Sequence, residues 1–198
     1  TVIDFPGDRS RDVYSMFFSE MDAADNGEPF LMNYIRSNIE DLLEQAGYQP
    51  PETFAQLLTI SEDLQQQGLV DWGYAWQGKQ SESLAAMFVE ILEGHGAYWV
   101  NPDTLEVGLD RPEAIASVEF LRTTIAKKVS PPGVTTYAED ETRLLFQNGK
   151  VAFLRNWPFV YSLAEDSAIA GKYQIKPMVH AVGKKSGATL GGWGLGIS

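Results

Sequence analysis

Residues 146–159 read FQNGKVAFLRNWPF, and the main signals for the architecture lie within this stretch. Asn148-Gly149 is a turn dipeptide that ends a helix over residues 140–147 and precedes an apolar strand over residues 151–154. Pro158 suits the first turn of a following helix, which places Trp157 at the mouth of that helix. The stretch therefore predicts helix, buried strand and helix, with aromatic side chains where the strand reaches the surface.

Further amphipathic helices are predicted on the N-terminal side of this stretch. They cover residues 39–46, ending at Gly47; residues 50–67, ending at Gly68; and residues 81–92. A fourth begins at Asp110-Arg-Pro-Glu, where Asp110 is the expected N-cap. Its expected buried face is Ile115, Val118, Leu121 and Ile125.

Short apolar strands separate the helices. They are expected at residues 151–154, 173–177 and 194–198, and residues 72–76 form an extended aromatic segment. Trp72, Tyr74 and Trp76 recur at every second residue, so we expect them to share one face. Helices that alternate with short strands predict the α/β class.

Composition narrows the range of functions. The 198 residues carry a formal net charge of −12, which argues against a nucleic-acid or anionic-membrane partner because both require a basic surface. Cysteine is absent, so thiolate metal sites and cysteine nucleophiles are excluded. No apolar run approaches the length of about 18–20 residues that spans a bilayer, and no signal peptide is recognisable. Neither end resembles a natural terminus, so we expect a piece of a longer protein.

Signatures of catalysis are weak. His95 and His180 have no Ser, Asp or other carboxylate at a familiar spacing, and we interpret both as structural residues. Residues 191–196 are rich in glycine but fail the dinucleotide-loop pattern, and no metal or cofactor motif is present. The carboxylates of Glu139-Asp140-Glu141 are explained by the start of a helix. One enzymatic alternative stays open, a fragment of a carbohydrate-active hydrolase with Glu139 or Glu141 as the acid.

The aromatic residues, 12% of the chain, point to a ligand. Trp157 and Phe159 follow a strand, and Trp193 stands between glycines. Arg155 and Asn156 precede Trp157 directly. Flat rings beside planar polar groups suit a sugar, because its apolar face stacks on a ring while its hydroxyls bond at the rim. The pattern therefore favours carbohydrate binding.

Five segments in this order resemble the family 1 extracellular solute-binding proteins of bacterial ABC sugar importers, and within them the trehalose/maltose-type receptors. They are DLLEQAGYQPPETF (41–54), GYAWQG (73–78), SPPGVTTY (130–137), FQNGKVAFLRNWPF (146–159) and ATLGGWGL (188–195). The resemblance implies a periplasmic-binding-protein-like (type II) fold of two α/β lobes that close on a sugar. Most of this chain would be the second lobe, over residues 39–175. Residues 1–38 would be a first-lobe remnant or divergent segment, and residues 176–198 a crossover back to the first lobe.

The resemblance also implies the site and the partners. Trp157, Phe159 and Trp193 would face the sugar, with the Gly191-Gly192 backbone beside Trp193; the family usually has Tyr where Phe159 stands. Arg155, Asn156, Trp76 and Gln77 match motifs near the cleft. Such receptors are periplasmic or extracellular, often lipid-anchored and monomeric, and they deliver sugar to ABC permease subunits without converting it. Because a closing cleft needs both lobes, a third possibility is that this chain alone binds nothing.

Overall fold

The computed structural model describes residues 33–36, 43–44 and 46–191. The chain divides into two compact units, Thr1–Phe30 and Leu31–Ser198, and every described residue belongs to the second unit. Its helices are α3 (Phe54–Gln66), α4 (Glu82–Gly94), α5 (Pro112–Ala126), α6 (Glu139–Gln147) and α7 (Val160–Glu165), with a 3₁₀ turn, η1, at Val134–Thr136. Its strands are β1 (Asn33–Arg36), β2 (Trp72–Ala75), β3 (Val151–Leu154) and β4 (Tyr173–Lys176).

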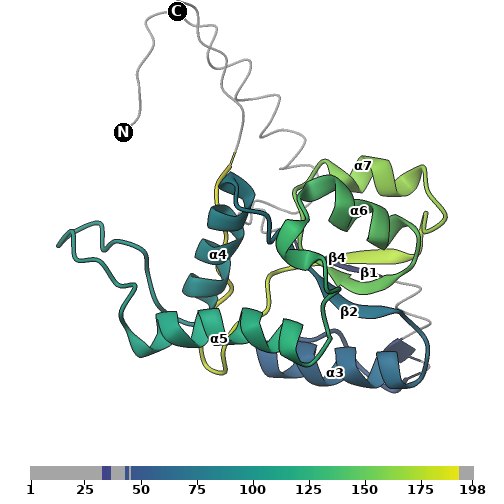
Figure 1. Ribbon diagram of the computed structural model, residues 1–198, viewed down its shortest axis with the longest axis horizontal. Coiled ribbons are helices and arrows are strands. Elements are labelled where there is room, and N and C mark those ends of the chain that lie inside the picture. The colour runs from purple at the N-terminus through teal and green to yellow at the C-terminus, as the bar shows by residue number, and fades with distance from the viewer. Residues whose placement is uncertain (1–32, 37–42, 45, 192–198) are drawn as a thin grey trace, which may run out of the picture. The chain divides into compact units, whose positions relative to one another are not determined.

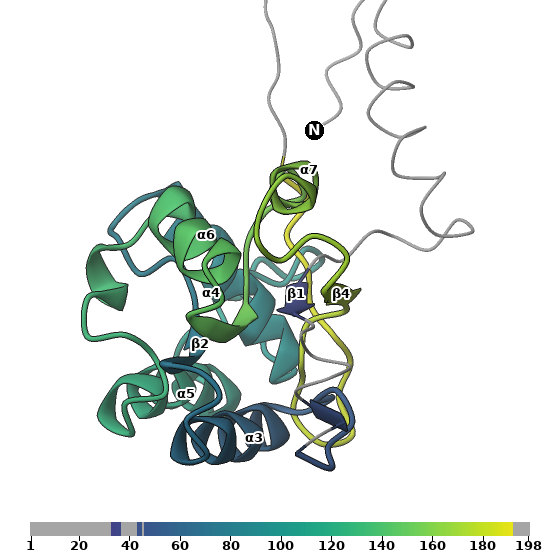
Figure 2. The same ribbon diagram turned by 90° about the vertical axis from the view of Figure 1, so that its right-hand side faces the viewer.

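The strands of the described residues form one mixed sheet in the order β2-β3-β1-β4. β2 and β3 are parallel, with Trp72 opposite Val151, whereas β1 is antiparallel to both β3 and β4. In Figure 1, α6 and α7 lie on one side of the sheet and α3 and α5 on the other. Figure 2 shows the same layering from the side, with β1 beside β4. All four residues of β3 are buried, as expected for a strand whose two faces are both covered.

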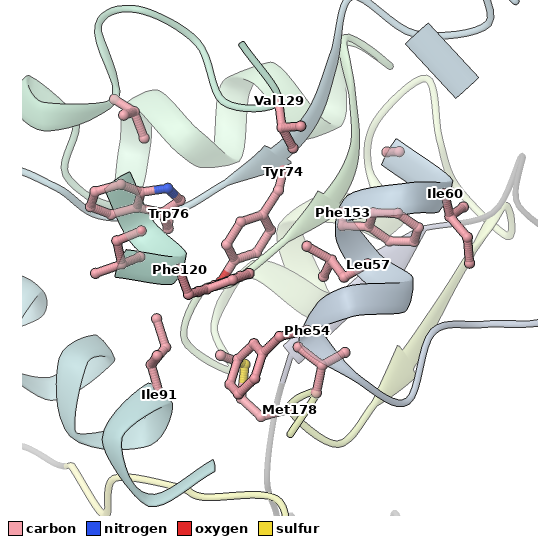
Figure 3. Packing of buried hydrophobic residues seen from close by; sticks show 14 of the residues in the cluster. Phe54, Leu57, Ile60, Tyr74, Trp76, Ile91, Phe120, Val129, Phe153 and Met178 are labelled. Atoms are coloured by element: carbon pink, nitrogen blue, oxygen red, sulfur yellow. The ribbon is translucent and has the colours of Figure 1, made fainter. Parts of the chain in front are cut away.

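The larger core lies between the sheet and helices α3, α4 and α5. Figure 3 shows the rings of Phe54, Tyr74 and Phe120 together at its centre. A second cluster joins β3 to α6 and α7, and it contains Ala75, Phe146, Val151, Leu154, Val160, Ala164 and Ile169. Tyr74 and Ala75 are neighbours in β2 but belong to different clusters, so β2 contributes to both cores.

The turn predicted at Asn148-Gly149 is confirmed. α6 ends at Gln147, and Gly149 adopts a φ of +70°, a conformation that favours glycine over residues with a Cβ. The strands predicted at residues 151–154 and 173–177 are present as β3 and β4. The strand predicted at residues 194–198 lies outside the described residues.

The prediction for the buried face of α5 was right for Leu121 but wrong for Ile115, Val118 and Ile125, which are exposed. Ile115 and Val118 are 55% and 44% exposed, whereas the buried residues are Ala114, Ser117, Phe120, Leu121 and Thr124. Small side chains let α5 approach α4 closely, and the Ser117 and Thr124 hydroxyls donate to carbonyls of their own helix, so their burial leaves no donor unpaired. Apolar periodicity cannot detect such a face. The N-cap is Arg111 rather than Asp110, with no side-chain cap bond and with Pro112 as the first helical residue.

The shared aromatic face of residues 72–76 is confirmed only in part. Tyr74 and Trp76 belong to the larger core, but Trp72 packs against the second cluster.

β1 lies in the segment predicted as a first-lobe remnant, yet it pairs with β3 and β4. This pairing does not decide where one lobe ends and the next begins, and the domain boundaries at residues 38 and 175 stay predictions. No described helix is both long and apolar enough to cross a membrane.

Candidate functional site

The candidate site lies where the two parallel strands end. β2 leads into Trp76-Gln77, and β3 leads into Arg155-Asn156-Trp157. The Arg155 amide donates to the Ala75 carbonyl at 3.0 Å, which keeps the two strand ends side by side. In α/β sheets, the carboxyl ends of parallel strands are the usual place for a ligand. The sequence motifs around Trp76 and Trp157 therefore meet at one edge of the sheet.

Arg155 is buried, and each of its three side-chain nitrogens donates to a protein group. Its side chain is 1% exposed; Nε donates to Glu90 Oε2 at 2.7 Å, Nη2 donates to Glu90 Oε1, and Nη1 donates to Gln77 Oε1 at 3.0 Å. Burial raises the pKa of the Glu90 carboxyl above its ordinary value, although the Arg155 guanidinium acts in the opposite direction. The pair neutralises its own charge, and the guanidinium lies over the Trp157 ring at 4.4 Å from the ring centre.

The two amide side chains of the site are also satisfied internally. Gln77 Nε2 donates to Thr142 Oγ1 at 2.8 Å and to the Arg155 carbonyl at 2.7 Å. Asn156 Nδ2 donates to Thr142 Oγ1 at 3.1 Å and to the Glu139 carbonyl at 3.0 Å, while its Oδ1 accepts from the Trp157 amide at 2.8 Å. These bonds join the ends of β2 and β3 to the first turn of α6 and fix the conformation of the loop that carries Trp157.

Trp76 is part of the core. It is 4% exposed, and its indole N–H donates to Ser130 Oγ at 3.1 Å and Thr124 Oγ1 at 3.2 Å. The structure thus places four of the predicted site residues, Trp76, Gln77, Arg155 and Asn156, beneath the surface, where they support the loop.

Trp157 is half-buried and held from several directions. Its indole Nε1 donates to Glu139 Oε1 at 3.1 Å, and Arg155 lies over the ring. Gly191 lies against the six-membered ring so closely that a Cβ there would come within 2.9 Å of Trp157 Cζ3 and Cη2. These contacts fix the orientation of the Trp157 ring within the protein itself.

Gly191 reaches Trp157 because the preceding segment follows α4 (Figure 1). The Thr189 hydroxyl donates to the Ala86 carbonyl at 2.7 Å, and the Thr189 backbone amide bonds to the Glu90 carboxyl. Glu90 therefore links this segment to Arg155. Gly192 and Trp193 lie outside the described residues.

Phe159 comes immediately before α7 and is 44% exposed. The preceding turn is closed by a bond from the Val160 amide to the Trp157 carbonyl at 3.2 Å, and α7 begins at Val160, two residues after Pro158. Trp157 and Phe159 are thus the two predicted aromatic residues that the structure presents at the surface of this loop.

Sequence reasoning missed Glu90 and did not foresee the contacts of Glu139. Glu90 lies among the buried residues Met87, Ile91 and Leu92 of α4. The signal in the sequence is an acidic residue on an apolar helical face, because a buried carboxylate needs a buried partner. For Glu139 the sequence offers the start of a helix or, in the enzymatic alternative, the role of an acid. Glu141 makes the bond to the Ala138 amide, at 2.9 Å, whereas the Glu139 side chain bonds the Ser83 hydroxyl and Trp157.

The two histidines, His95 and His180, make contacts within the protein. The His95 ring stacks on Phe54 with 4.1 Å between ring centres, and its Nδ1 lies 2.9 Å from the Ile91 carbonyl. Burial lowers the pKa of His95. His180 Nδ1 lies 2.9 Å from the Ala181 carbonyl. Among the described residues, no group of three or more His, Asp or Glu side chains could hold a metal ion.

The Trp157 ring is fixed at the carboxyl edge of the parallel strands, which is where α/β proteins usually bind ligands. Residues 22–198 match the family model described as "Bacterial extracellular solute-binding protein", and the chain belongs to this family. It is 33% identical over 165 residues to a "Probable ABC transporter-binding protein" of Deinococcus radiodurans, which covers 80% of this chain and 39% of the relative. A "Maltotriose-binding protein" of Pyrococcus abyssi is 25% identical over 61% of this chain and 25% of the relative.

Solved structures with bound sugars or sugar alcohols are also similar to this chain. "Maltose bound T. maritima MalE3" superposes with a TM-score of 0.75 at 33% identity, over 93% of this chain and 50% of that one. A ribitol complex from Agrobacterium radiobacter superposes with a TM-score of 0.66 at 20% identity, over 87% of this chain and 49% of that one, and shows the fold alone. The predicted type II fold class is confirmed. The chain spans half or less of the length of these relatives.

Proposed function

We propose that the protein binds a di- or oligosaccharide of the trehalose/maltose type against Trp157, without converting it chemically. The observation that carries the proposal is the fixed, half-buried Trp157 ring at the carboxyl edge of β2 and β3. Stacking on such a ring suits the apolar face of a pyranose. The maltose-bound and maltotriose-binding relatives support this sugar class, and the relatives matched are binding proteins.

In this proposal the predicted site residues have two roles. Trp157 and Phe159 contact the sugar, together with Trp193 and the Gly191-Gly192 backbone. The buried residues Arg155, Asn156, Gln77 and Trp76 hold the contact residues in place. This division follows the exposure of the side chains. Phe159 is 44% exposed, whereas the four supporting side chains are buried.

The proposed partner is an ABC permease, to which the protein would deliver its sugar from the periplasm or the cell exterior. The printed name of the D. radiodurans relative and the extracellular description of the family support this role. A lipid anchor and a monomeric state belong to the same proposal.

Calorimetric titration of the purified protein with trehalose, maltose and maltotriose tests the proposal. We expect saturable binding of at least one sugar, weakened by about 1–3 kcal/mol in Trp157→Ala, which removes a stacked aromatic anchor. Trp99→Ala is the matched control, because Trp99 is 43% exposed on the loop between α4 and α5. Absence of any heat signal with all three sugars would refute the proposal.

A further inference from the structure

Glu139 stands at the edge of the Trp157 ring with part of its carboxylate uncommitted. Both hydrogen bonds that described residues give to this carboxylate, from Ser83 Oγ and from Trp157 Nε1, fall on Oε1. The side chain is neither buried nor fully exposed. Oε2 can therefore accept a further bond beside the ring.

The charge of Glu139 has no ion-pair partner among residues 33–36, 43–44 and 46–191. Arg155, the cation on the same ring, is paired with Glu90 through two of its nitrogens. Taken together, Arg155, Glu90 and Glu139 carry one net negative charge next to Trp157.

Glu139 is held at a defined position. It is the first residue of α6, where the helix dipole favours a negative charge, and Asn156 bonds its backbone carbonyl at 3.0 Å. The cap bond of the same helix is made by Glu141, so the Glu139 side chain is not needed for capping. Within the part of the chain that the structure describes, its side chain bonds Trp157 and Ser83.

We propose that Glu139 is a specificity-determining contact residue: its free carboxylate oxygen accepts a ligand hydroxyl beside Trp157 and discriminates against acidic sugars. The inference rests on the proposed function. A hydroxyl donates to a carboxylate in a charge-assisted bond, which is stronger than a bond between neutral groups. A ligand carboxylate cannot donate and meets a like charge in a partly desolvated site, which is unfavourable.

The test compares neutral sugars with acidic counterparts. Wild type, Glu139→Gln and Glu141→Gln are titrated with trehalose, maltose and maltotriose, and with derivatives in which every primary alcohol is oxidised to a carboxylate. Glu141→Gln is the matched control, since it removes the same charge two residues away on the same helical turn. Thermal unfolding of all three proteins shows whether the variants are folded.

We expect wild type to bind a neutral sugar at least about tenfold more tightly than its acidic derivative. In Glu139→Gln, neutral-sugar affinity falls about fivefold to tenfold, acidic-sugar affinity does not fall, and the ratio of the two affinities narrows accordingly. Glu141→Gln keeps the wild-type ratio.

Each other outcome counts against the inference. If Glu139→Gln weakens both ligands equally or neither, Glu139 has at most a structural role, and sugar binding itself stands. A wild-type preference for the acidic derivative also overturns the inference but leaves sugar binding intact. If wild type binds no sugar, the proposed function fails and the inference fails with it.

Discussion

The buried pair of Arg155 and Glu90 allows a sharp stability prediction. The two side chains are 1% and 6% exposed, and two nitrogens of the guanidinium bond the carboxylate. Glu90→Gln keeps the shape but leaves the Arg155 charge buried without a counterion. Removing one member of such a pair costs about 3–5 kcal/mol, so we expect the free energy of unfolding to fall by about 3 kcal/mol.

Equilibrium urea unfolding followed by far-UV circular dichroism measures this change. Glu119→Gln is the control, because Glu119 forms an exposed pair with Arg122, 54% and 71% exposed, and should cost about 0–0.5 kcal/mol. The double variant Glu90→Leu/Arg155→Met should lose less than its two single variants added together, since no lone charge remains. Two results would show that the pair does not hold the site together. One is that Glu90→Gln is no more destabilising than Glu119→Gln. The other is that the stability loss of the double variant equals the sum of the losses of its two single variants.

Three further predictions concern separate features. His95 has a lowered pKa in the folded state, so the unfolded state binds its proton more readily; stability should fall as pH drops below the ordinary value of 6.5, and His95→Gln should flatten that part of a pH series of unfolding curves. Gly191→Ala brings a Cβ within 2.9 Å of the Trp157 ring, so calorimetry should show weaker sugar binding with little loss of thermal stability. Thr53→Ala removes the bond that the Thr53 hydroxyl accepts from the Gln56 amide at the start of α3, and urea unfolding should show a loss of about 1 kcal/mol, whereas an unchanged midpoint would contradict the cap.

Local sequence signals predicted most of the regular structure. Asn148-Gly149 marked the end of α6 and the start of β3 because glycine tolerates the φ of +70° that the turn requires. Pro112 marked the start of α5 because its missing amide hydrogen costs nothing there. The buried face of α5 was not predictable in this way, because Ala114, Ser117 and Thr124 pack by being small and bonding their own helix.

That the motifs around Trp76 and Trp157 meet at one edge of the sheet follows from their places after strands, but the contacts among these residues were not predictable. Trp157 and Phe159 were identified by their place after a strand. The sequence could not show that Arg155 pairs with Glu90, 65 residues away, because that contact depends on how α4 packs against the end of β3. The same holds for Glu139 and Trp157, whose bond exists only because α6 begins beside the carboxyl end of β3.

The indole N–H resonance of Trp157 offers the most direct test of sugar binding at this ring. The chain has five tryptophans, and single substitutions assign their N–H signals in a ¹⁵N–¹H spectrum. On titration with maltotriose, the Trp157 signal should shift saturably, because the ring and its bond to Glu139 lie at the proposed contact, while the Trp99 signal stays in place. A saturating sugar that leaves the Trp157 signal unmoved would show that this ring is not the binding platform.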